Sequence, residues 1–157
     1  MISSDFDFDP DAEMDFDDAL DLTVERHGEF FEWTFEEKAF FYNKYVYHNQ
    51  GPRRGVPDNR HSDTEIIAER AKAYLCKYLS CTEEDLAIYT LDFEFWVDCF
   101  PEDETAEHEF YSVLFLLPPE EEGGQWRNQY QLEISAYTGD LIHFTDMVEI
   151  KKQNGGA

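Results

Sequence analysis

The sequence predicts an α+β fold in which a helix packs on a four-stranded antiparallel meander sheet, preceded by an additional N-terminal helical segment. Two observations indicate this fold. Apolar residues recur at helical spacing up to about residue 80, and from residue 87 they alternate with a period of two. The length of 157 residues suits one domain, and 42% hydrophobic residues suffice for a core. We expect an acidic N-terminal segment (1–25), a single α+β domain (26–150) and a C-terminal tail (151–157).

The N-terminal segment combines a helix-start pattern with strong negative charge. Asp9 and Pro10 are typical of an N-cap followed by the first helical residue, which predicts a short acidic helix over 10–22 that ends before Gly28. A solvated tail is the alternative interpretation. A third is that this segment docks on the basic residues of the loop 49–61.

Two later helices begin with a capping box, in which an N-cap hydroxyl is followed three residues on by Glu. Thr34 with Glu37 starts a helix over 35–47, and its many aromatic residues predict packing on two sides. Ser62 with Glu65 starts the clearest helix, over 63–80. Its core-facing stripe consists of Ile67, Ala71, Tyr74, Leu75 and Tyr78. Between the two helices, the Gly- and Pro-rich stretch 49–61 is predicted to be a loop.

Alternating patterns define the sheet. Strands are predicted over 88–99, 110–117, 129–137 and 141–150. The second is apolar on both faces, which is typical of a central strand. The last is expected to bury Ile142, Phe144, Val148 and Ile150. Gly139 allows the positive φ that a hairpin turn over 137–140 requires.

Charge is distributed very unevenly. Residues 1–25 hold 10 acidic and no basic side chains, and residues 82–122 hold 14 acidic and no basic ones, within a total of −24. Such a field repels nucleic acid phosphates and anionic membranes, and it favours a basic protein partner. We therefore expect no direct nucleic acid binding and no membrane insertion, while the oligomeric state stays open.

The cysteines and the N-terminus bear on the compartment. Cys76, Cys81 and Cys99 are predicted to be reduced thiols, with a Cys76–Cys81 or Cys81–Cys99 disulfide as the alternative in an exported protein. The first residues lack a basic and an apolar region, so no signal peptide is visible. The expected location is cytoplasmic as the sequence stands, and extracytoplasmic if a leader has been removed.

No catalytic or metal-binding pattern is present. The five histidines are scattered without ligand spacing and are interpreted as surface or capping residues. Cys99 could meet His108 or His143 in space as a nucleophile and its base, but nothing beside these residues would activate the thiol. The alternating aspartates from Asp5 to Asp11 do not fit a calcium loop. We expect a protein that is not an enzyme and has no catalytic residues, cofactor or metal.

A resemblance to a known family rests on residues 62–146. The segment Ala136, Thr138, Gly139, Asp140, Leu141 and Ile142, which follows a helix and two strands, resembles the hallmark hairpin of the PepSY family. The resemblance implies a cystatin-like helix-on-sheet fold and a non-catalytic role. PepSY domains are thought to inhibit or regulate peptidases, or to act as extracytoplasmic binding modules.

The functional prediction is a binding or inhibitory module with a protein partner, either basic or a peptidase. The alternative is a nucleic-acid mimic whose carboxylates occupy the basic groove of a DNA- or RNA-binding protein, as in phage-type inhibitors. The binding surface is predicted to be a sheet face, a strand edge or the acidic connection before the second strand. The candidate partner-binding residues of that connection are Asp98, Glu102, Asp103, Glu104, Glu107 and Glu109.

Overall fold

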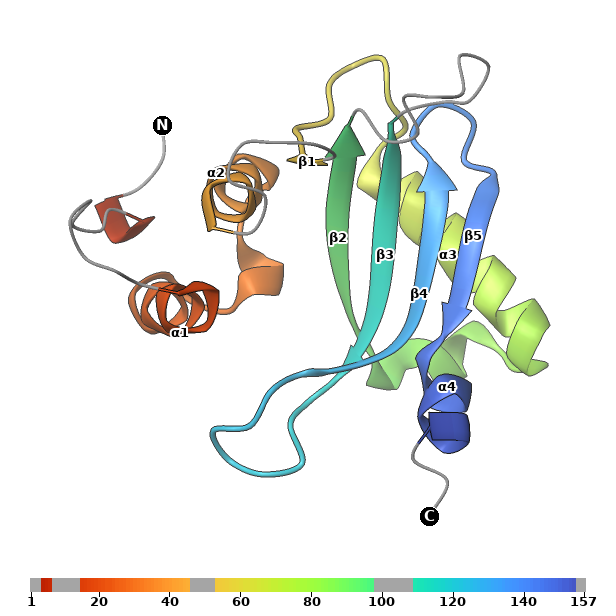
Figure 1. The fold of residues 1–157 in the computed structure, drawn as a ribbon. Helices are drawn as coiled ribbons and strands as arrows, with labels where there is room; N and C mark the ends of the chain where they lie inside the picture. The colour runs from red at the N-terminus through yellow and green to blue at the C-terminus, as the bar shows by residue number, and fades with distance from the viewer. Residues whose placement is uncertain (1–3, 7–14, 46–52, 98–108, 155–157) are drawn as a thin grey trace.

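The computed structural model describes residues 4–6, 15–45, 53–97 and 109–154, and it is an α+β fold (Figure 1). Its helices are α1 (Phe16–His27), α2 (Phe35–Tyr45), α3 (Thr64–Leu79) and α4 (Met147–Asn154). Short 3₁₀ turns are η1 (Ser4–Phe6), η2 (Phe30–Glu32) and η3 (Glu83–Ile88). The strands are β1 (Arg53–Arg54), β2 (Thr90–Val97), β3 (Phe110–Leu117), β4 (Arg127–Ser135) and β5 (Leu141–Asp146).

The sheet confirms the predicted antiparallel meander. Its strand order is β1-β2-β3-β4-β5, and every neighbouring pair is antiparallel. β3 begins and ends where the sequence predicted, and residues on both of its faces are buried. Gly139 has φ 77° in the turn before β5, as the hairpin required.

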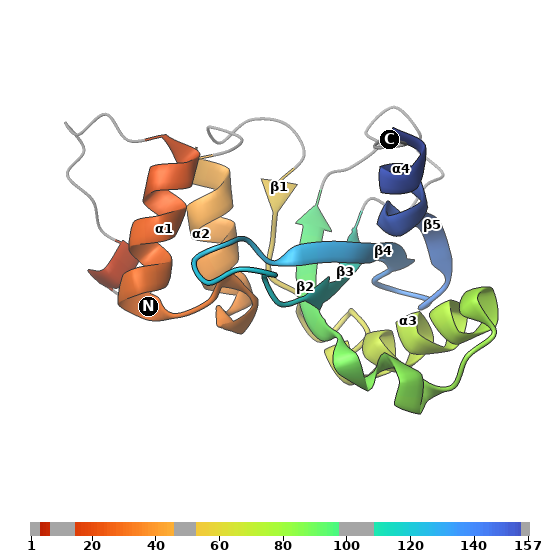
Figure 2. The same ribbon diagram turned by 90° about the horizontal axis from the view of Figure 1, so that it is seen from below.

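The main core lies between α3 and one face of the sheet (Figure 2). Ile67, Ala71 and Leu75 of the predicted helix stripe are fully buried against sheet residues that include Val113 and Leu132. Tyr74 is partly buried and Tyr78 is exposed, so the stripe narrows toward the end of α3. The helix-on-sheet arrangement is therefore confirmed.

A second, separate core holds the N-terminal helices together. Phe6, Ala19, Trp33 and Phe41 are its buried residues, contributed by η1, α1, the segment after η2, and α2. α1 ends at Gly28, whose amide donates to the carbonyl of Val24. Both bonds of the predicted Thr34–Glu37 capping box are present, at 2.8 and 3.2 Å. Because Phe41 lies in this core and Phe35 packs against the main core, α2 packs on two sides as predicted.

Charged side chains occupy the contact between these two cores. Lys38 of α2 donates to Asp92 Oδ1 at 2.5 Å and to the carbonyl oxygen of Phe93 at 2.6 Å. Arg54 Nη1 lies 2.5 Å from Glu94 Oε2, and its guanidinium lies 4.3 Å from the ring centre of Tyr42. We call Lys38, Asp92, Arg54 and Glu94 the charged seam. In the charged seam, two bases neutralise two acids, and all of these side chains except Glu94 are buried.

Two predicted helix starts differ from the structure. The N-terminal helix starts at Phe16 with Asp15 as its N-cap, whereas Asp9 and Pro10 lie outside the described residues. N-cap Asp63 of α3 makes no capping hydrogen bond with its side chain, so the Ser62–Glu65 capping box does not form. Ser62 instead bonds to the sheet, because its amide donates to the carbonyl of Ala136 and its carbonyl accepts from the Tyr111 hydroxyl.

The last strand and the basic loop also differ from expectation. β5 ends at Asp146, and α4 occupies the remainder of the predicted strand. Ile142 and Ile150 are exposed by 41% and 39% instead of buried. Within the predicted loop, β1 pairs with the end of β2. Arg54 binds Glu94 and Arg60 binds Asp58, and neither forms an ion pair with residues 4–6 or 15–25, the part of the N-terminal segment that the structure describes.

Candidate functional site around His61 and Glu109

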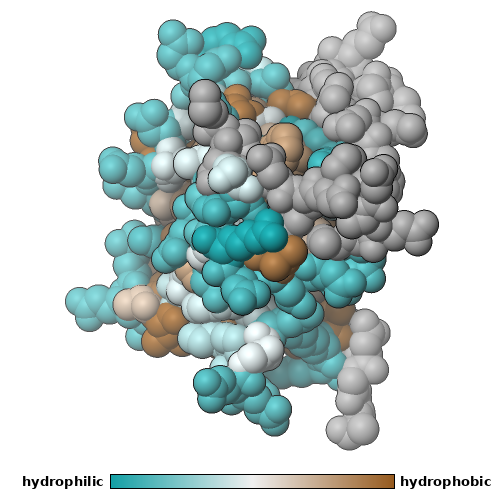
Figure 3. Space-filling view, turned by 90° about the vertical axis from the view of Figure 1, so that its left-hand side faces the viewer, coloured by the Kyte–Doolittle hydropathy of each residue, from teal (hydrophilic) through white to brown (hydrophobic). Residues whose placement is uncertain are grey.

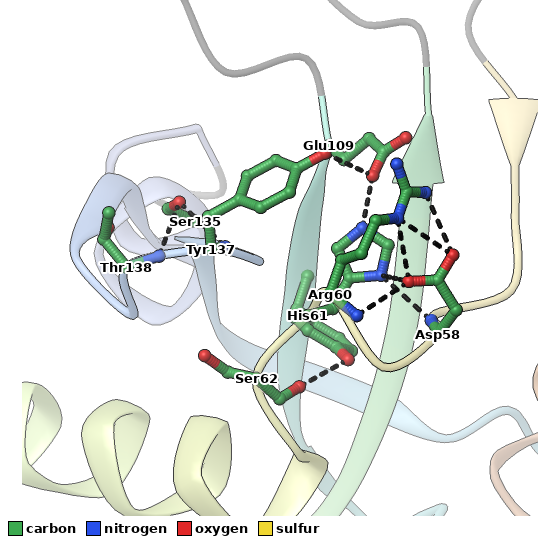
Figure 4. Close-up of polar contacts among 9 residues, drawn as sticks. Asp58, Arg60, His61, Ser62, Glu109, Ser135, Tyr137 and Thr138 are labelled. Carbon is green, nitrogen blue, oxygen red and sulfur yellow. Dashed lines mark hydrogen bonds and ion pairs between the residues drawn. The ribbon is translucent and has the colours of Figure 1, made fainter.

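Only one of the six candidate partner-binding residues lies in the part of the chain that the structure describes. Asp98, Glu102, Asp103, Glu104 and Glu107 lie outside it. Glu109 directly precedes β3, and it faces the loop before α3 and the turn before β5 (Figure 4). The site is therefore built outward from this carboxylate.

Glu109 is the acceptor of a partly buried polar cluster. Its Oε2 accepts a hydrogen bond from the Tyr137 hydroxyl at 2.7 Å and contacts His61 Nε2 (Figure 4). Burial by itself would raise the pKa of Glu109, but the hydrogen bonds from Tyr137 and His61 outweigh it and hold the pKa below its usual value. Glu109 is consequently a carboxylate at neutral pH.

His61 uses both ring nitrogens within the protein. Nδ1 accepts from the backbone amide of Asp58 at 2.9 Å, so Nε2 carries the proton and donates to Glu109. The side chain is 1% exposed, and the ring packs against Phe95 and Tyr137 with centroids 4.8 and 5.1 Å away. Because neither nitrogen is free, His61 fastens the 55–63 loop to β3 and to the β4–β5 turn.

Arg60 organises the outer part of the same loop. Its Nε and Nη2 bind the Asp58 carboxylate at 2.9 to 3.2 Å, and its backbone amide donates to Asp58 Oδ1 at 2.9 Å. These bonds to Arg60 lower the pKa of Asp58 to about 2. An open hollow of about 530 Å³ lies beside this loop, and its lining includes the carboxylates of Asp58, Asp63 and Glu65. The hollow can accept a positively charged group.

A ridge of carboxylates runs along α1. Asp17, Asp21 and Glu25 follow one another at four-residue spacing, which places neighbours about 6 Å apart along the helix axis. All three are exposed, and none forms an ion pair with a residue that the structure describes. Hydrophilic residues dominate the side of the molecule that carries α1 and α2, and apolar residues appear there in separate patches (Figure 3).

The sheet ends in an open edge at β5. β5 pairs with β4 on one side, and no other strand of the described ranges pairs with its second side (Figure 1). Two successive apolar residues of β5, Leu141 and Ile142, are 36% and 41% exposed. This edge can therefore pair with an extended segment of another chain.

Sequence reasoning missed the buried histidine. His61 was interpreted as a surface or capping residue, and no ligand spacing distinguishes it from the other histidines. Its role depends on Glu109, which is 48 positions away, and that separation leaves no local pattern. Cys76 and Cys81 are free thiols, and burial is the main cause that raises the pKa of Cys76. Cys99 and His108 lie outside the described residues.

The chain matches no protein-family model, no curated protein and no solved structure. Among the described residues, no group of three or more His, Cys, Asp or Glu side chains is arranged to hold a metal ion. No helix in the same ranges is both long and apolar enough to cross a membrane.

Proposed function

We propose that the chain is a non-catalytic binding module of PepSY-like architecture that inhibits or regulates a protein partner through the open edge of β5. The exposed edge with Leu141 and Ile142 carries this proposal. Unpaired strand edges offer backbone donors and acceptors to an extended peptide, and exposed side chains beside them add specificity. The resemblance of residues 62–146 to PepSY domains supports the same role.

The charge of the molecule supports a basic partner. The net charge of −24 attracts cationic proteins and raises their association rate. The hollow beside the 55–63 loop presents the carboxylates of Asp63 and Glu65, next to the Asp58–Arg60 pair, to an arginine or lysine side chain. A peptidase or another protein with a basic extended segment fits both features.

A second function is favoured by the carboxylate ridge of α1. Asp17, Asp21 and Glu25 present a regular row of negative charges on an exposed helix face. Such a row can occupy the basic groove of a protein that binds DNA or RNA. In this alternative the chain is a nucleic-acid mimic, and the edge of β5 has no role in binding.

Capture of partners from host lysate with two variants as bait separates these functions. Ile142→Lys places a charge on the β5 edge, and Ile88→Lys, at a residue of η3 that is 65% exposed, is its matched control. The triple variant Asp17→Asn, Asp21→Asn, Glu25→Gln neutralises the ridge. Its control removes three exposed charges elsewhere through Glu83→Gln, Glu84→Gln and Glu121→Gln.

The edge proposal expects Ile142→Lys to abolish capture of a partner that survives moderate salt, while Ile88→Lys and the ridge variant retain that partner. The mimic alternative expects a nucleic-acid-binding protein that is lost steeply as salt rises and that only the ridge variant fails to capture. Capture unaffected by Ile142→Lys would overturn the edge proposal.

A further inference from the structure

The N-terminal 3₁₀ turn η1 fills a pocket on the α1–α2 pair. Phe6 is fully buried, and its ring meets those of His27 and Trp33 edge-on, with centroids 4.9 and 5.1 Å away. A third ring, Phe40 of α2, is 6.5 Å away. Residues from α1, α2 and the segment between them thus enclose the phenyl ring of Phe6. Figures 1 and 2 both show η1 lying against this helical pair.

Asp5, the residue before Phe6, is bound by the side chain of His27. Asp5 Oδ2 lies 2.8 Å from His27 Nδ1, and Glu37 Oε2 lies 2.5 Å from His27 Nε2. An ionised carboxylate only accepts hydrogen bonds, and only the imidazolium form of histidine carries a proton on both nitrogens. His27 therefore satisfies both carboxylates only when it is protonated.

Glu37 is fixed independently of this contact. Its second oxygen, Oε1, accepts from the amide of Thr34 in the capping box of α2. Trp33 is held by a bond from its indole Nε1 to the carbonyl of Gly28 at 2.8 Å. The charged groups that face His27 are Asp5 from η1 and Glu37 from α2, and both carboxylates stabilise the protonated imidazole. The pocket walls are thus built by α1, α2 and the segment between them.

We propose that this pocket is a recognition site for an acidic–aromatic dipeptide, Asp-Phe, and that the chain's own Asp5–Phe6 is its resident, displaceable ligand. The aromatic walls take the phenyl ring, and His27 takes the carboxylate. The site is distinct from the β5 edge and from the α1 ridge, and it does not depend on the function proposed above. The following residues, Asp7 and Phe8, repeat the same dipeptide in the sequence.

Protonation of His27 controls occupancy of the site. The hydrogen bond that His27 donates to the Asp5 carboxylate is the largest cause that raises the pKa of His27 above its ordinary value of 6.5. A group whose pKa is raised by a contact stabilises that contact fully below its unperturbed pKa, and it loses this effect as pH rises through the raised pKa. The dipeptide is therefore held at mildly acidic pH and released toward alkaline pH.

The test uses the full chain with Phe6→Ala, which empties the aromatic part of the pocket. The probe is an end-blocked peptide with the sequence of residues 2–9, and the control peptide has both phenylalanines replaced by alanine. The readout is the NMR signal of the Trp33 indole. At pH 5.5 we expect a saturable shift with the probe and none with the control. We expect at least tenfold weaker binding to the wild-type chain, because the tethered segment competes.

The pH response gives the second criterion. Affinity for Phe6→Ala is expected to fall at least tenfold from pH 5.5 to pH 8.5. Adding His27→Gln should remove that dependence. Equal binding by the wild-type chain, equal binding at both pH values or no shift at all would overturn the proposal. If the Trp33 signal of the wild-type chain shifts as protein concentration rises, the bound Asp5–Phe6 belongs to a second copy of the chain. That result would overturn binding within one chain.

A further variant covers the case in which Phe6→Ala does not fold. Asp5→Asn leaves the phenyl ring in place and removes only the carboxylate on Nδ1. We expect the NMR titration of His27 to show a lower pKa in Asp5→Asn than in the wild-type chain. An unchanged pKa would overturn the assigned contact.

Discussion

Lys38 Nζ lies 2.5 Å from Asp92 Oδ1, although 54 positions separate the two residues in the sequence. Their side chains are 5% and 2% exposed, so the pair lies almost entirely out of water. Burial is the main cause that raises the pKa of Asp92, and Lys38 opposes it. The pair joins the N-terminal helices to the sheet.

Lys38→Met is expected to lower the free energy of unfolding by about 3–5 kcal/mol, because it leaves the Asp92 carboxylate buried without its counter-charge. The double variant Lys38→Met, Asp92→Leu should recover most of this loss, since it removes both charges. Urea unfolding measures both values. Lys77→Met, at an exposed position of α3, is the control and should change stability little. A mild effect of Lys38→Met alone would contradict the buried pair.

Gly55→Ala is expected to destabilise the fold by about 1–3 kcal/mol through overpacking. A Cβ at this position would lie 2.5 Å from Val97 Cγ1 and 3.3 Å from Phe95 Cδ1. The double variant Gly55→Ala, Val97→Ala frees that space. Thermal unfolding should therefore show a smaller loss for Gly55→Ala in the Val97→Ala background than in the wild-type chain. Equal losses in both backgrounds would rule out the clash.

Acid stability should depend on the Glu109 cluster. The pKa of Glu109 is lowered in the folded state, so its contribution is present above the unfolded pKa and is lost as pH falls through the folded pKa. Tyr137→Phe removes one hydrogen bond to this carboxylate. We expect its pKa to rise and the acid-dependent loss of stability to shrink, as measured by NMR titration and urea unfolding at several pH values.

Tyr78→Phe is the matched control for that experiment. Its hydroxyl donates to Asp146 at 2.7 Å, so the variant also removes one tyrosine–carboxylate bond, but on another part of the surface. The titration of Glu109 should be the same in Tyr78→Phe as in the wild-type chain. A change of equal size in both variants would show that the effect is not local.

Alkaline unfolding should follow two buried tyrosines. Burial is the main cause that raises the pKa of Tyr111 and of Tyr130 to about 12. Their contribution to stability is fully present below pH 10, and it is lost as pH rises through 12, because the unfolded chain releases these protons earlier. Ultraviolet absorbance should show phenols that ionise near pH 12, and Tyr111→Phe should remove one of them. Ionisation of all nine tyrosines near pH 10 would contradict this.

The periodic elements could be predicted from the sequence because their signals are local. The alternation over 110–117 gave β3 without error, and the apolar stripe on 63–80 identified the helix that covers the sheet. Gly139 marked the turn for the same reason. The stretch Met147 to Ile150 was assigned to a strand because a short apolar pattern fits both periods.

A capping signal could have settled that ambiguity. Asp146 Oδ1 accepts from the backbone amide of Glu149 at 2.9 Å, as an N-cap does at the start of a helix. The polar contacts were beyond sequence reasoning. Lys38, Asp92, His27 and His61 find partners on distant elements, and no spacing along the chain records such pairs. Asp92 and Glu94 stand at alternate positions of β2, and their partners in the charged seam, Lys38 and Arg54, come from α2 and β1.

The two cores are joined by buried ion pairs as well as by Phe35 of α2, whose ring contacts Phe95 and Tyr111 of the main core, and the ion pairs have a consequence for motion. A single hydrophobic core opens as one cooperative unit, whereas the charges of this junction regain hydration when water enters, which lowers the cost of separating the two halves. Amide hydrogen exchange should therefore divide the chain into two classes, with α1 and α2 exchanging at a lower opening free energy than β3 and β4. Salt and pH would then change the opening free energy of the N-terminal helices, while the amides of the sheet remain protected from exchange.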